Sequence, residues 1–288
     1  MDLTRLRVLA AVAREGSVTA AADALNYAQP SVSHHLARLE EEAGVPLLQR
    51  AGRGIRLTDA GRLLAERAEE ILGRLAATQL ELAAHAGLRA GRVRVAAFPS
   101  ALATLVPAAA TRFAADHPGV ELALTEAEPP AALAALRAGD VDVALVFEHD
   151  DAPESGRLNV TATPLMAEPT YLVTRKAARG GLVAYANEPW IAGCERCRAH
   201  LLASCERAGF VPRIAFETDD YVAVQALVAA GVGVSTLPGL ALRAHRHKDV
   251  RVRRLPGDRR TVSAMVYGKP PAPAPVAAFV EALRSSEL

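Results

Sequence analysis

The sequence predicts an α/β protein with a small helical N-terminal domain, a long connecting helix and a C-terminal domain of two α/β lobes. Apolar residues follow helical spacing to about residue 88, apart from one short hairpin. From Arg92 onward, short apolar strands alternate with Ala-rich helices, which favours a largely parallel sheet. With 288 residues, 51% of them hydrophobic, the chain can form two cores. We expect domains at residues 1–58 and 91–288, joined by a helix and hinge at 59–90.

Three helices are expected in the N-terminal domain, over residues 2–14, residues 18–25, and from a turn at 26–27 to about residue 43. In the first helix, Leu6, Leu9 and Val12 recur at helical spacing. Gly16 ends this helix, and Ser17 is a good N-cap for the second one. A further glycine stops the third helix.

The third helix has an unusual outward face. Val32, Leu36 and Leu39 define its buried side on a wheel of about 100° per residue, and the opposite face carries small or donor-bearing residues: Pro30, Ser31, Ser33, His34 and Arg38. Gln29 projects ahead of the helix, whereas His35 lies nearer the buried flank. Gln, Arg and Ser can all read base edges, so this face fits the DNA major groove. The alternative is an ordinary solvated face.

Residues 49–58, QRAGRGIRLT, predict a Gly-rich hairpin tip with a local charge of +3. Over 43–58 the only charged residues are Arg50, Arg53 and Arg56. A basic tip of this kind fits DNA phosphate or a narrow minor groove. The alternatives are a solvated hairpin, or a buried structural role for Arg50.

The long helix expected at 59–88 has an apolar seam at steps of four and three residues: Leu64, Ala68, Ile71, Leu75, Thr78 and Leu82. Such an a/d pattern favours pairing of two helices and therefore a homodimer. The alternative is packing against the chain's own C-terminal domain.

The C-terminal part contains two similar sets of strands. The first is expected at 93–98, 120–125 and 141–147, and the second at 170–174, 181–185, 213–218 and 232–238. A last helix follows the Pro-Ala segment at 270–276. Two lobes fit these sets better than one large sheet, with lobe I at about 91–163 and 266–288 and lobe II at about 164–265.

Residues 1–58 resemble the N-terminal domain of LysR-type transcriptional regulators. The matching run is GSVTAAADALNYAQPSVSHHLARLEEEAGVPLLQRAGRGIRLTDAG, and ALVAAGVGVSTLP at 226–238 resembles a turn of the same family. The resemblance implies a winged helix-turn-helix, a dimerising helix and a regulatory domain like type 2 periplasmic binding proteins. It implies double-stranded DNA with an interrupted inverted repeat as a partner, a small-molecule effector, and a homodimer or homotetramer. The implied DNA contacts are Ser17, Gln29, Pro30, Ser31, Ser33, His34, His35, Arg38, Arg50, Arg53 and Arg56.

Three positions depart from the family pattern. His34 and His35 stand where many members have Arg-Gln, which changes the expected base preference. Ala28 replaces a Ser or Thr, so the third helix lacks an N-cap at a cost of about 1 kcal/mol. Leu48 replaces a frequent Phe, which changes packing only.

A cleft between two lobes is the default ligand site. Ser100 follows the first strand and starts a helix, where free N–H groups favour an anionic effector, and the family often uses this Ser position for its effector. The second family contact aligns with Pro129, so acidic neighbours would substitute for a hydroxyl. The expected effector residues are Pro99, Ser100, Ala101, Glu126, Glu128, Phe147, Gly193, Cys194, Thr218 and Thr236.

Three cysteines allow an alternative reading. Cys194, Cys197 and His200 are spaced like half a metal site, and Cys205 follows. Residues three apart also lie on one face of an ordinary helix, and the second C-x-x-C pair of a typical zinc site is missing. The readings are free thiols, an oxidant-responsive switch of DNA binding, or structural zinc. We expect free thiols and no metal.

The motifs, net charge and apolar runs of the sequence exclude several other classes of function. The chain has no nucleophile elbow, P-loop, zinc-protease or dinucleotide motif, so we expect neither an enzyme nor a cofactor. A net charge of +1 confines any nucleic-acid surface to local patches. No leader or membrane-spanning run is evident, and we expect a cytoplasmic protein without membrane contact.

Overall fold

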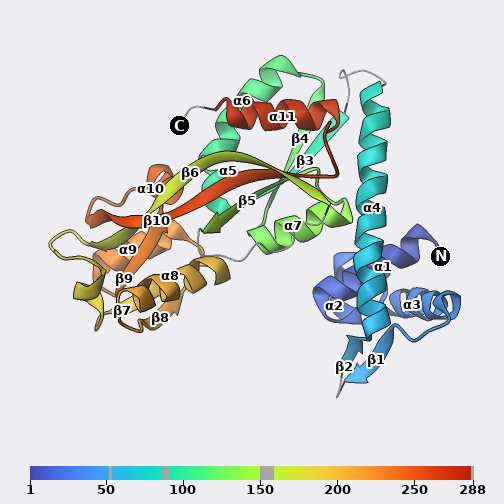
Figure 1. The fold of residues 1–288 in the computed structure, drawn as a ribbon, viewed down its shortest axis with the longest axis horizontal. Coiled ribbons are helices and arrows are strands. Elements are labelled where there is room, and N and C mark those ends of the chain that lie inside the picture. Colours follow the sequence, from blue (N-terminus) through green and yellow to red (C-terminus); the bar gives the residue numbers. More distant parts are fainter. Residues whose placement is uncertain (52–53, 86–90, 150–158, 287–288) are drawn as a thin grey trace.

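The computed structural model describes residues 1–51, 54–85, 91–149 and 159–286. A helical domain lies at one end of a long helix, and a larger α/β domain lies beside the other half of that helix (Figure 1). No helix within these ranges is long and apolar enough to cross a membrane.

The N-terminal domain consists of three helices, a hairpin and the long helix: α1 (Leu3–Glu15), α2 (Val18–Ala24), α3 (Gln29–Ala43), β1 (Leu48–Ala51), β2 (Gly54–Leu57) and α4 (Asp59–His85). Its core contains Leu9, Val32 and Leu39, none of which is exposed. Ser17 caps α2 as expected. At the start of α3, Ala28 makes no side-chain cap hydrogen bond.

The C-terminal domain is built on one eight-stranded sheet in the order β4-β3-β5-β10-β6-β9-β7-β8. We use lobe I for the half formed by β3 (Gly91–Ala97), β4 (Val120–Glu126), β5 (Val143–His149), α5 (Pro99–Leu102), α6 (Leu105–Asp116), α7 (Pro129–Ala138) and α11 (Ala274–Arg284). We use lobe II for β7 (Pro189–Ala192), β8 (Arg213–Glu217), β9 (Val234–Pro238), the 3-10 helix η1 (Leu182–Tyr185), α8 (Glu195–Arg207), α9 (Tyr221–Ala230) and α10 (Gly239–Ala244).

Two long antiparallel strands join the lobes. They are β6 (Val160–Arg175) and β10 (Val250–Tyr267), and they pair with each other along most of their length. β10 also pairs with β5 in lobe I, while β6 pairs with β9 in lobe II. Two lobes are therefore present as expected, but they share one sheet through these crossing strands (Figure 1).

Some predicted strands differ from the structure. Residues 181–185 were expected to be a strand but contain η1, and Tyr185 is part of the lobe II core. A short apolar run does not distinguish strand from helix. The strand expected at 170–174 is the end of the much longer β6. Neither β7 nor β10 was predicted; in β10, five arginines and a Pro-Gly pair interrupt the apolar alternation.

The long helix α4 packs on lobe I of its own chain. At Gly73, a Cβ atom would lie 2.7 Å from the Arg137 carbonyl oxygen, so only glycine allows this close approach. The hydroxyl of Tyr267, the last residue of β10, donates to the Glu70 carbonyl at 2.9 Å. The alternative for this helix, packing against the chain's own C-terminal domain, is thus present. The face of α4 that packs on lobe I lies outside the predicted seam.

Candidate functional site

The exposed face of α3 consists of the side chains that helical spacing predicted. Val32, Leu36 and Leu39 are at most 3% exposed. His35 is half-buried, and its ring centroid lies 6.1 Å from that of Tyr27. The predicted orientation of the helix is confirmed, because the residues on its open side are Gln29, Pro30, Ser31, Ser33, His34 and Arg38.

Several polar groups near this face already have local partners. Gln29 Nε2 donates to Ser33 Oγ at 3.2 Å, and Arg38 Nη1 lies 2.8 Å from a Glu41 oxygen. Exposed pairs of this kind contribute about 0–1 kcal/mol, so DNA can compete for both side chains. Ser17 Oγ accepts a backbone N–H of α2 at 3.1 Å, so its own proton remains for an outside acceptor.

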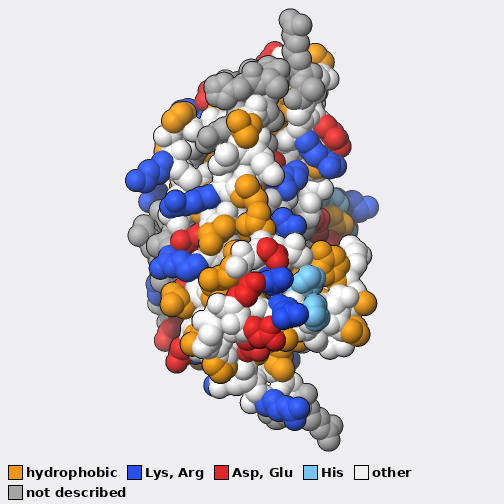
Figure 2. Space-filling model, turned by 90° about the vertical axis from the view of Figure 1, so that its right-hand side faces the viewer, with side chains coloured by type: hydrophobic (Ala, Val, Ile, Leu, Met, Phe, Trp, Pro, Cys, Tyr) orange, Lys and Arg blue, Asp and Glu red, His pale blue; other side chains and the backbone are white. Residues whose placement is uncertain are grey.

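The hairpin β1–β2 presents basic side chains beside α3. Leu48 pairs with Leu57 at its base. Arg50 and Arg56 are exposed, so the alternative of a buried structural Arg50 is wrong. Arg53 lies outside the described residues. Figure 2 shows basic side chains at the end of the molecule where the hairpin lies, and histidines beside arginine and acidic side chains above it.

The predicted seam of α4 divides between two environments. Ala68 is fully buried in the N-terminal core, and Leu64 packs partly against the same core. Ala68 is therefore a correction, because its side chain faces the chain's own α1 and offers no surface to a partner. Ile71 is 44% exposed and Leu82 is 66% exposed. Leu75 is half-buried and Thr78 is exposed, so these positions leave an apolar strip on the open side.

A cleft of about 670 Å³, including its opening to solvent, lies between the lobes. Eight of the ten predicted effector residues line it: Pro99, Ser100, Glu128, Phe147, Gly193, Cys194, Thr218 and Thr236. The other two do not. Ala101 is fully buried in the lobe I core because its side chain faces away from the cleft, and Glu126 is exposed outside it. Residues that sequence reasoning missed complete the lining: Phe98, His149, Thr170, Cys197, His200, Asp219, Tyr221, Val224, Ser235, Leu237, Pro238, Ala241 and Arg260.

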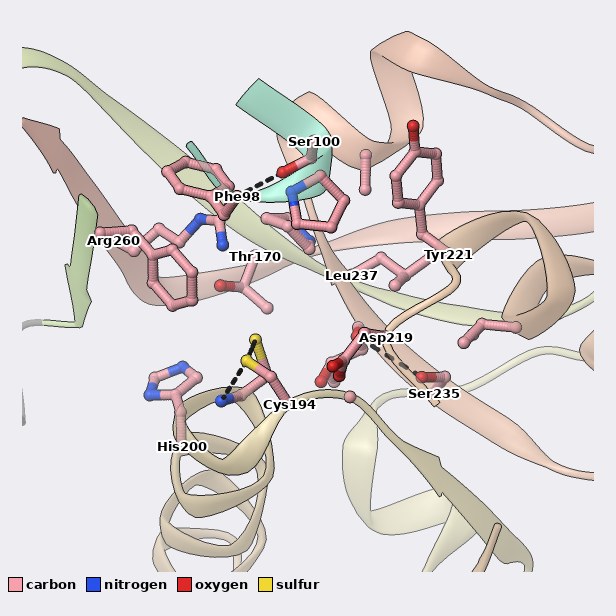
Figure 3. A pocket seen from close by; sticks show the side chains of 18 of the residues that line it. Phe98, Ser100, Thr170, Cys194, His200, Asp219, Tyr221, Ser235, Leu237 and Arg260 are labelled. Carbon is pink, nitrogen blue, oxygen red and sulfur yellow. Dashed lines mark hydrogen bonds between the residues drawn. The ribbon is translucent and has the colours of Figure 1, made fainter. Parts of the chain in front are cut away.

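Arg260 organises the cleft wall although it is only 2% exposed. Its Nε donates to Glu168 Oε1 at 2.7 Å. Its Nη2 donates to Ser100 Oγ at 3.1 Å, and Figure 3 shows both of these residues at the cleft. Its guanidinium carbon lies 4.1 Å from the centre of the Phe147 ring and 5.0 Å from that of Phe98. Aromatic faces and the carboxylate together hold the charge in place. No motif marks this residue, since it is one of several arginines in β10.

The helix start at Ser100 is a weaker anion site than expected. The helix α5 is a single turn of four residues. Pro99 has no N–H, and the N–H groups of Ala101 and Leu102 both donate to the Phe98 carbonyl. Because the donors expected to converge here are mostly used inside the turn, the physical reason for expecting an anionic effector is lost.

Cys194 and Cys197 form a close thiol pair in the cleft. Cys194 is the N-cap of α8, and its Sγ lies 3.0 Å from that of Cys197. The hydrogen bond from Cys194 lowers the pKa of the Cys197 thiol, and the same contact raises that of Cys194. Cys205 is buried elsewhere, which raises its pKa to about 11. Within the described part of the chain, no three His, Cys, Asp or Glu side chains are grouped to hold a metal, which gives the zinc alternative no support.

Acidic groups lie near the thiol pair in the cleft. Burial raises the pKa of the Glu128 carboxyl; a hydrogen bond with Cys194 acts in the opposite direction, and the charge of Asp219 raises it further. The rings of His149 and His200 stack nearby at 3.8 Å, and His200 lies 3.7 Å from Asp258. The lining is therefore rich in titratable groups.

Two family descriptions match most of the chain. Residues 3–62 match the bacterial regulatory helix-turn-helix protein of the lysR family, and residues 86–287 match the LysR substrate binding domain. The chain is 33% identical over 278 residues to a probable cat1 operon transcriptional activator of Acinetobacter lwoffii, with 92% of this chain and 89% of the relative covered.

Solved structures share the same architecture. CbnR, a LysR family transcriptional regulator, matches with a TM-score of 0.54 and 27% identity, covering 99% of this chain and 100% of that chain. Full-length CbnR complexed with its target DNA matches with a TM-score of 0.57 and 25% identity, covering 99% of both chains.

A helix-turn-helix domain joined to a two-lobed domain with a ligand cleft defines a DNA-binding transcriptional regulator that responds to an effector. The chain belongs to the LysR family of such regulators. Its fold is the family's mixed α/β fold, with a regulatory domain like a periplasmic binding protein. The relatives compared are regulators of transcription and not enzymes.

Proposed function

We propose that this regulator reads its DNA site with the exposed face of α3 and holds the backbone with the β1–β2 hairpin. Gln29 and His34 would contact base edges, because they lie at the start of α3 and on its outermost side. The remaining proposed contacts are Ser17, Pro30, Ser31, Ser33, His35, Arg38, Arg50, Arg53 and Arg56. The observation that carries this proposal is the donor-rich, exposed face opposite Val32, Leu36 and Leu39.

The proposed assembly is a homodimer or a homotetramer on an interrupted inverted repeat. Two half-sites about 34 Å apart require a protein with two-fold symmetry. Leu64, Ile71, Leu75, Thr78 and Leu82 would contribute the pairing surface of α4, with exposed Ile71 and Leu82 supporting this role. Since the proposed partner is DNA, the proposed place of action is the bacterial cytoplasm.

The proposed effector site is the cleft between the lobes. A small molecule there would contact lobe I through Ser100 and lobe II through the loop at 193–194, and so change the angle between the lobes. A ligand shifts this equilibrium only by its differential affinity for the two arrangements. The buried Arg260–Ser100 hydrogen bond supports the choice of Ser100 as the key contact.

A second candidate is an oxidant-responsive switch, favoured by the 3.0 Å distance between Cys194 and Cys197. A disulfide has an S–S distance of about 2.05 Å, so a shift of about 1 Å would close the bond. A hydroperoxide would oxidise Cys197 to a sulfenic acid and leave as the alcohol or water. Attack by Cys194 would then form the disulfide and release water. Cys205 is buried away from the cleft and would not take part.

Promoter occupancy separates the two candidates. We expect Ser100→Ala to abolish the effector response with DNA binding intact, and Cys194→Ser to change effector affinity modestly. Each variant is measured with and without effector, and with and without peroxide. Loss of a peroxide response in Cys194→Ser, beside an intact effector response in Ser100→Ala, would favour the thiol switch.

A further inference from the structure

Two buried polar atoms of the cleft have no hydrogen-bond partner within the described part of the chain. Thr170, on β6, is only 4% exposed, and its hydroxyl has no hydrogen-bond partner among the residues that the structure describes. The same holds within that set for Glu128 Oε2. Both residues line the cleft. In the view of Figure 3, Thr170 stands between the Arg260 guanidinium and the Cys194 thiol. Unsatisfied buried groups are costly, so these atoms require partners from a ligand or water.

The charges that line the cleft do not balance. Arg260 is already matched by Glu168 at 2.7 Å. Within the described lining, the remaining charged residues, His aside, are Glu128 and Asp219, and both are acidic. The two lining histidines, His149 and His200, lie beside the Phe147 ring or against Asp258. A ligand with only a carboxylate would add a further negative charge to this set.

The side of the cleft near Arg260 offers hydroxyl donors. Ser100 Oγ accepts from Arg260, which leaves the Ser100 proton for an acceptor in the cleft. The Thr170 hydroxyl supplies a second donor. Glu128 is close to Ser100 in the fold, because the two residues follow the adjacent parallel strands β4 and β3. Donor and acceptor groups therefore stand at neighbouring strand ends.

We propose that the cleft binds an amino-acid-like zwitterion. Its protonated nitrogen donates to Glu128 and Asp219, and its carboxylate accepts from Ser100 and Thr170. Buried Phe147, Leu237 and Val224 line the same cleft and cover an apolar side chain. This inference rests on the proposed effector site, and it proposes a zwitterion where an anionic effector was expected. A cation beside Glu128 also offsets the desolvation that raises the pKa of this carboxyl.

The test uses the full-length protein and the free L-amino acids as probes. Thermal unfolding identifies amino acids that stabilise it, and calorimetry gives their affinity. For each one, the N-acetyl derivative, the amine without carboxylate and the acid without nitrogen are compared. We expect the amino acid to bind at least about tenfold more tightly than each of these three, since each loses one charge-assisted hydrogen bond.

Two variants provide the matched comparison. Glu128→Gln should weaken amino-acid binding about tenfold, and should raise the unfolding midpoint of the ligand-free protein because a desolvated charge is removed. Glu126→Gln, on the exposed end of β4, should change neither property.

Three outcomes would overturn the proposal. In the first, no amino acid stabilises the protein. In the second, an acid without nitrogen binds as well as the amino acid; if Ser100→Ala weakens that binding, the effector site stands and only its ligand class is wrong. In the third, Glu128→Gln binds amino acids normally. An amino acid that binds as expected without changing DNA occupancy would instead count against the effector role of the cleft.

Discussion

Arg260 and Glu168 face each other across the two strands that join the lobes, with Nε 2.7 Å from Oε1 and both residues 2% exposed. Glu168 Oε2 also accepts the N–H of Leu240 at the start of α10. One carboxylate thus connects β10 to lobe II, while the guanidinium reaches Ser100 in lobe I. The pair therefore links both cleft walls to the strands between them.

Breaking this pair should destabilise the protein strongly. We expect Arg260→Met or Glu168→Met to lower the free energy of unfolding by about 3–5 kcal/mol, because each leaves a buried charge without its partner. The double variant should lose less free energy of unfolding than either single variant. Urea unfolding measures all three. A double variant that loses the sum of both single effects would mean that the two charges are not coupled.

The hairpin contacts should appear in the salt dependence of DNA binding. If Arg53 and Arg56 each contact one phosphate, alanine at each position should flatten the slope of log K against log salt by about 0.9. Affinity should fall similarly for all DNA sequences. Fluorescence anisotropy over a salt series measures this, with Arg112→Ala on α6 of lobe I as the control. An unchanged slope would count against the hairpin as a phosphate contact.

Base readout by α3 should show as a loss of discrimination. Gln29→Ala or His34→Ala should cost about 1–3 kcal/mol at the cognate site and relax base preference at one position. Binding of each variant is compared between cognate DNA, single-base variants and random DNA. If binding to all three kinds of DNA weakens equally, these residues contact phosphate and not bases.

The missing N-cap of α3 predicts a stabilising substitution. Ala28 has the extended backbone of an N-cap, with φ −71° and ψ 138°, but no side-chain hydrogen bond. Ala28→Ser should raise the free energy of unfolding by about 1 kcal/mol. Ala37→Ser, at an exposed mid-helix position of α3, should instead lower it by about 0.5 kcal/mol. Equal effects of the two serines in urea unfolding would exclude capping as the cause.

Charges on the open strip of α4 should disrupt the proposed dimer. Replacing Ile71 and Leu75 by Asp places carboxylates in a desolvated apolar contact, which is costly without partners. Sedimentation of the full chain should then show a monomer. Val211→Asp, at a position 86% exposed in lobe II, should leave the assembly unchanged. A double variant that stays dimeric would place the pairing surface elsewhere.

Helical spacing predicted the N-terminal domain well because each helix buries one stripe. Val32, Leu36 and Leu39 fix the orientation of α3, and so its exposed face, without knowledge of distant contacts. Strand ends in lobe I were also predictable, since Ser100 and Glu128 directly follow apolar runs.

Long-range pairing was not predictable in the same way. Arg260 reaches the cleft because β10 crosses the sheet beside β6. Its partner on β6, Glu168, is 92 positions away in the sequence. Ala68 fits the seam by spacing, yet α1 covers it. The surroundings of both residues depend on which distant elements pack together, and local periodicity contains no information on this packing.

The strand β10 carries both a residue of the cleft lining and a residue that contacts α4. Arg260 and Tyr267 lie seven residues apart on it, a length of roughly 23 Å at about 3.3 Å per residue. Over this length β10 pairs with β6, with a register shift between Val262 and Ser263, and with β5 as far as Met265. The strand ends at Tyr267. There the tyrosine hydroxyl holds the backbone of α4, whose N-terminal half packs against the DNA-binding helices. A ligand that displaced Arg260 along the strand would therefore act on α4 through seven residues of one strand.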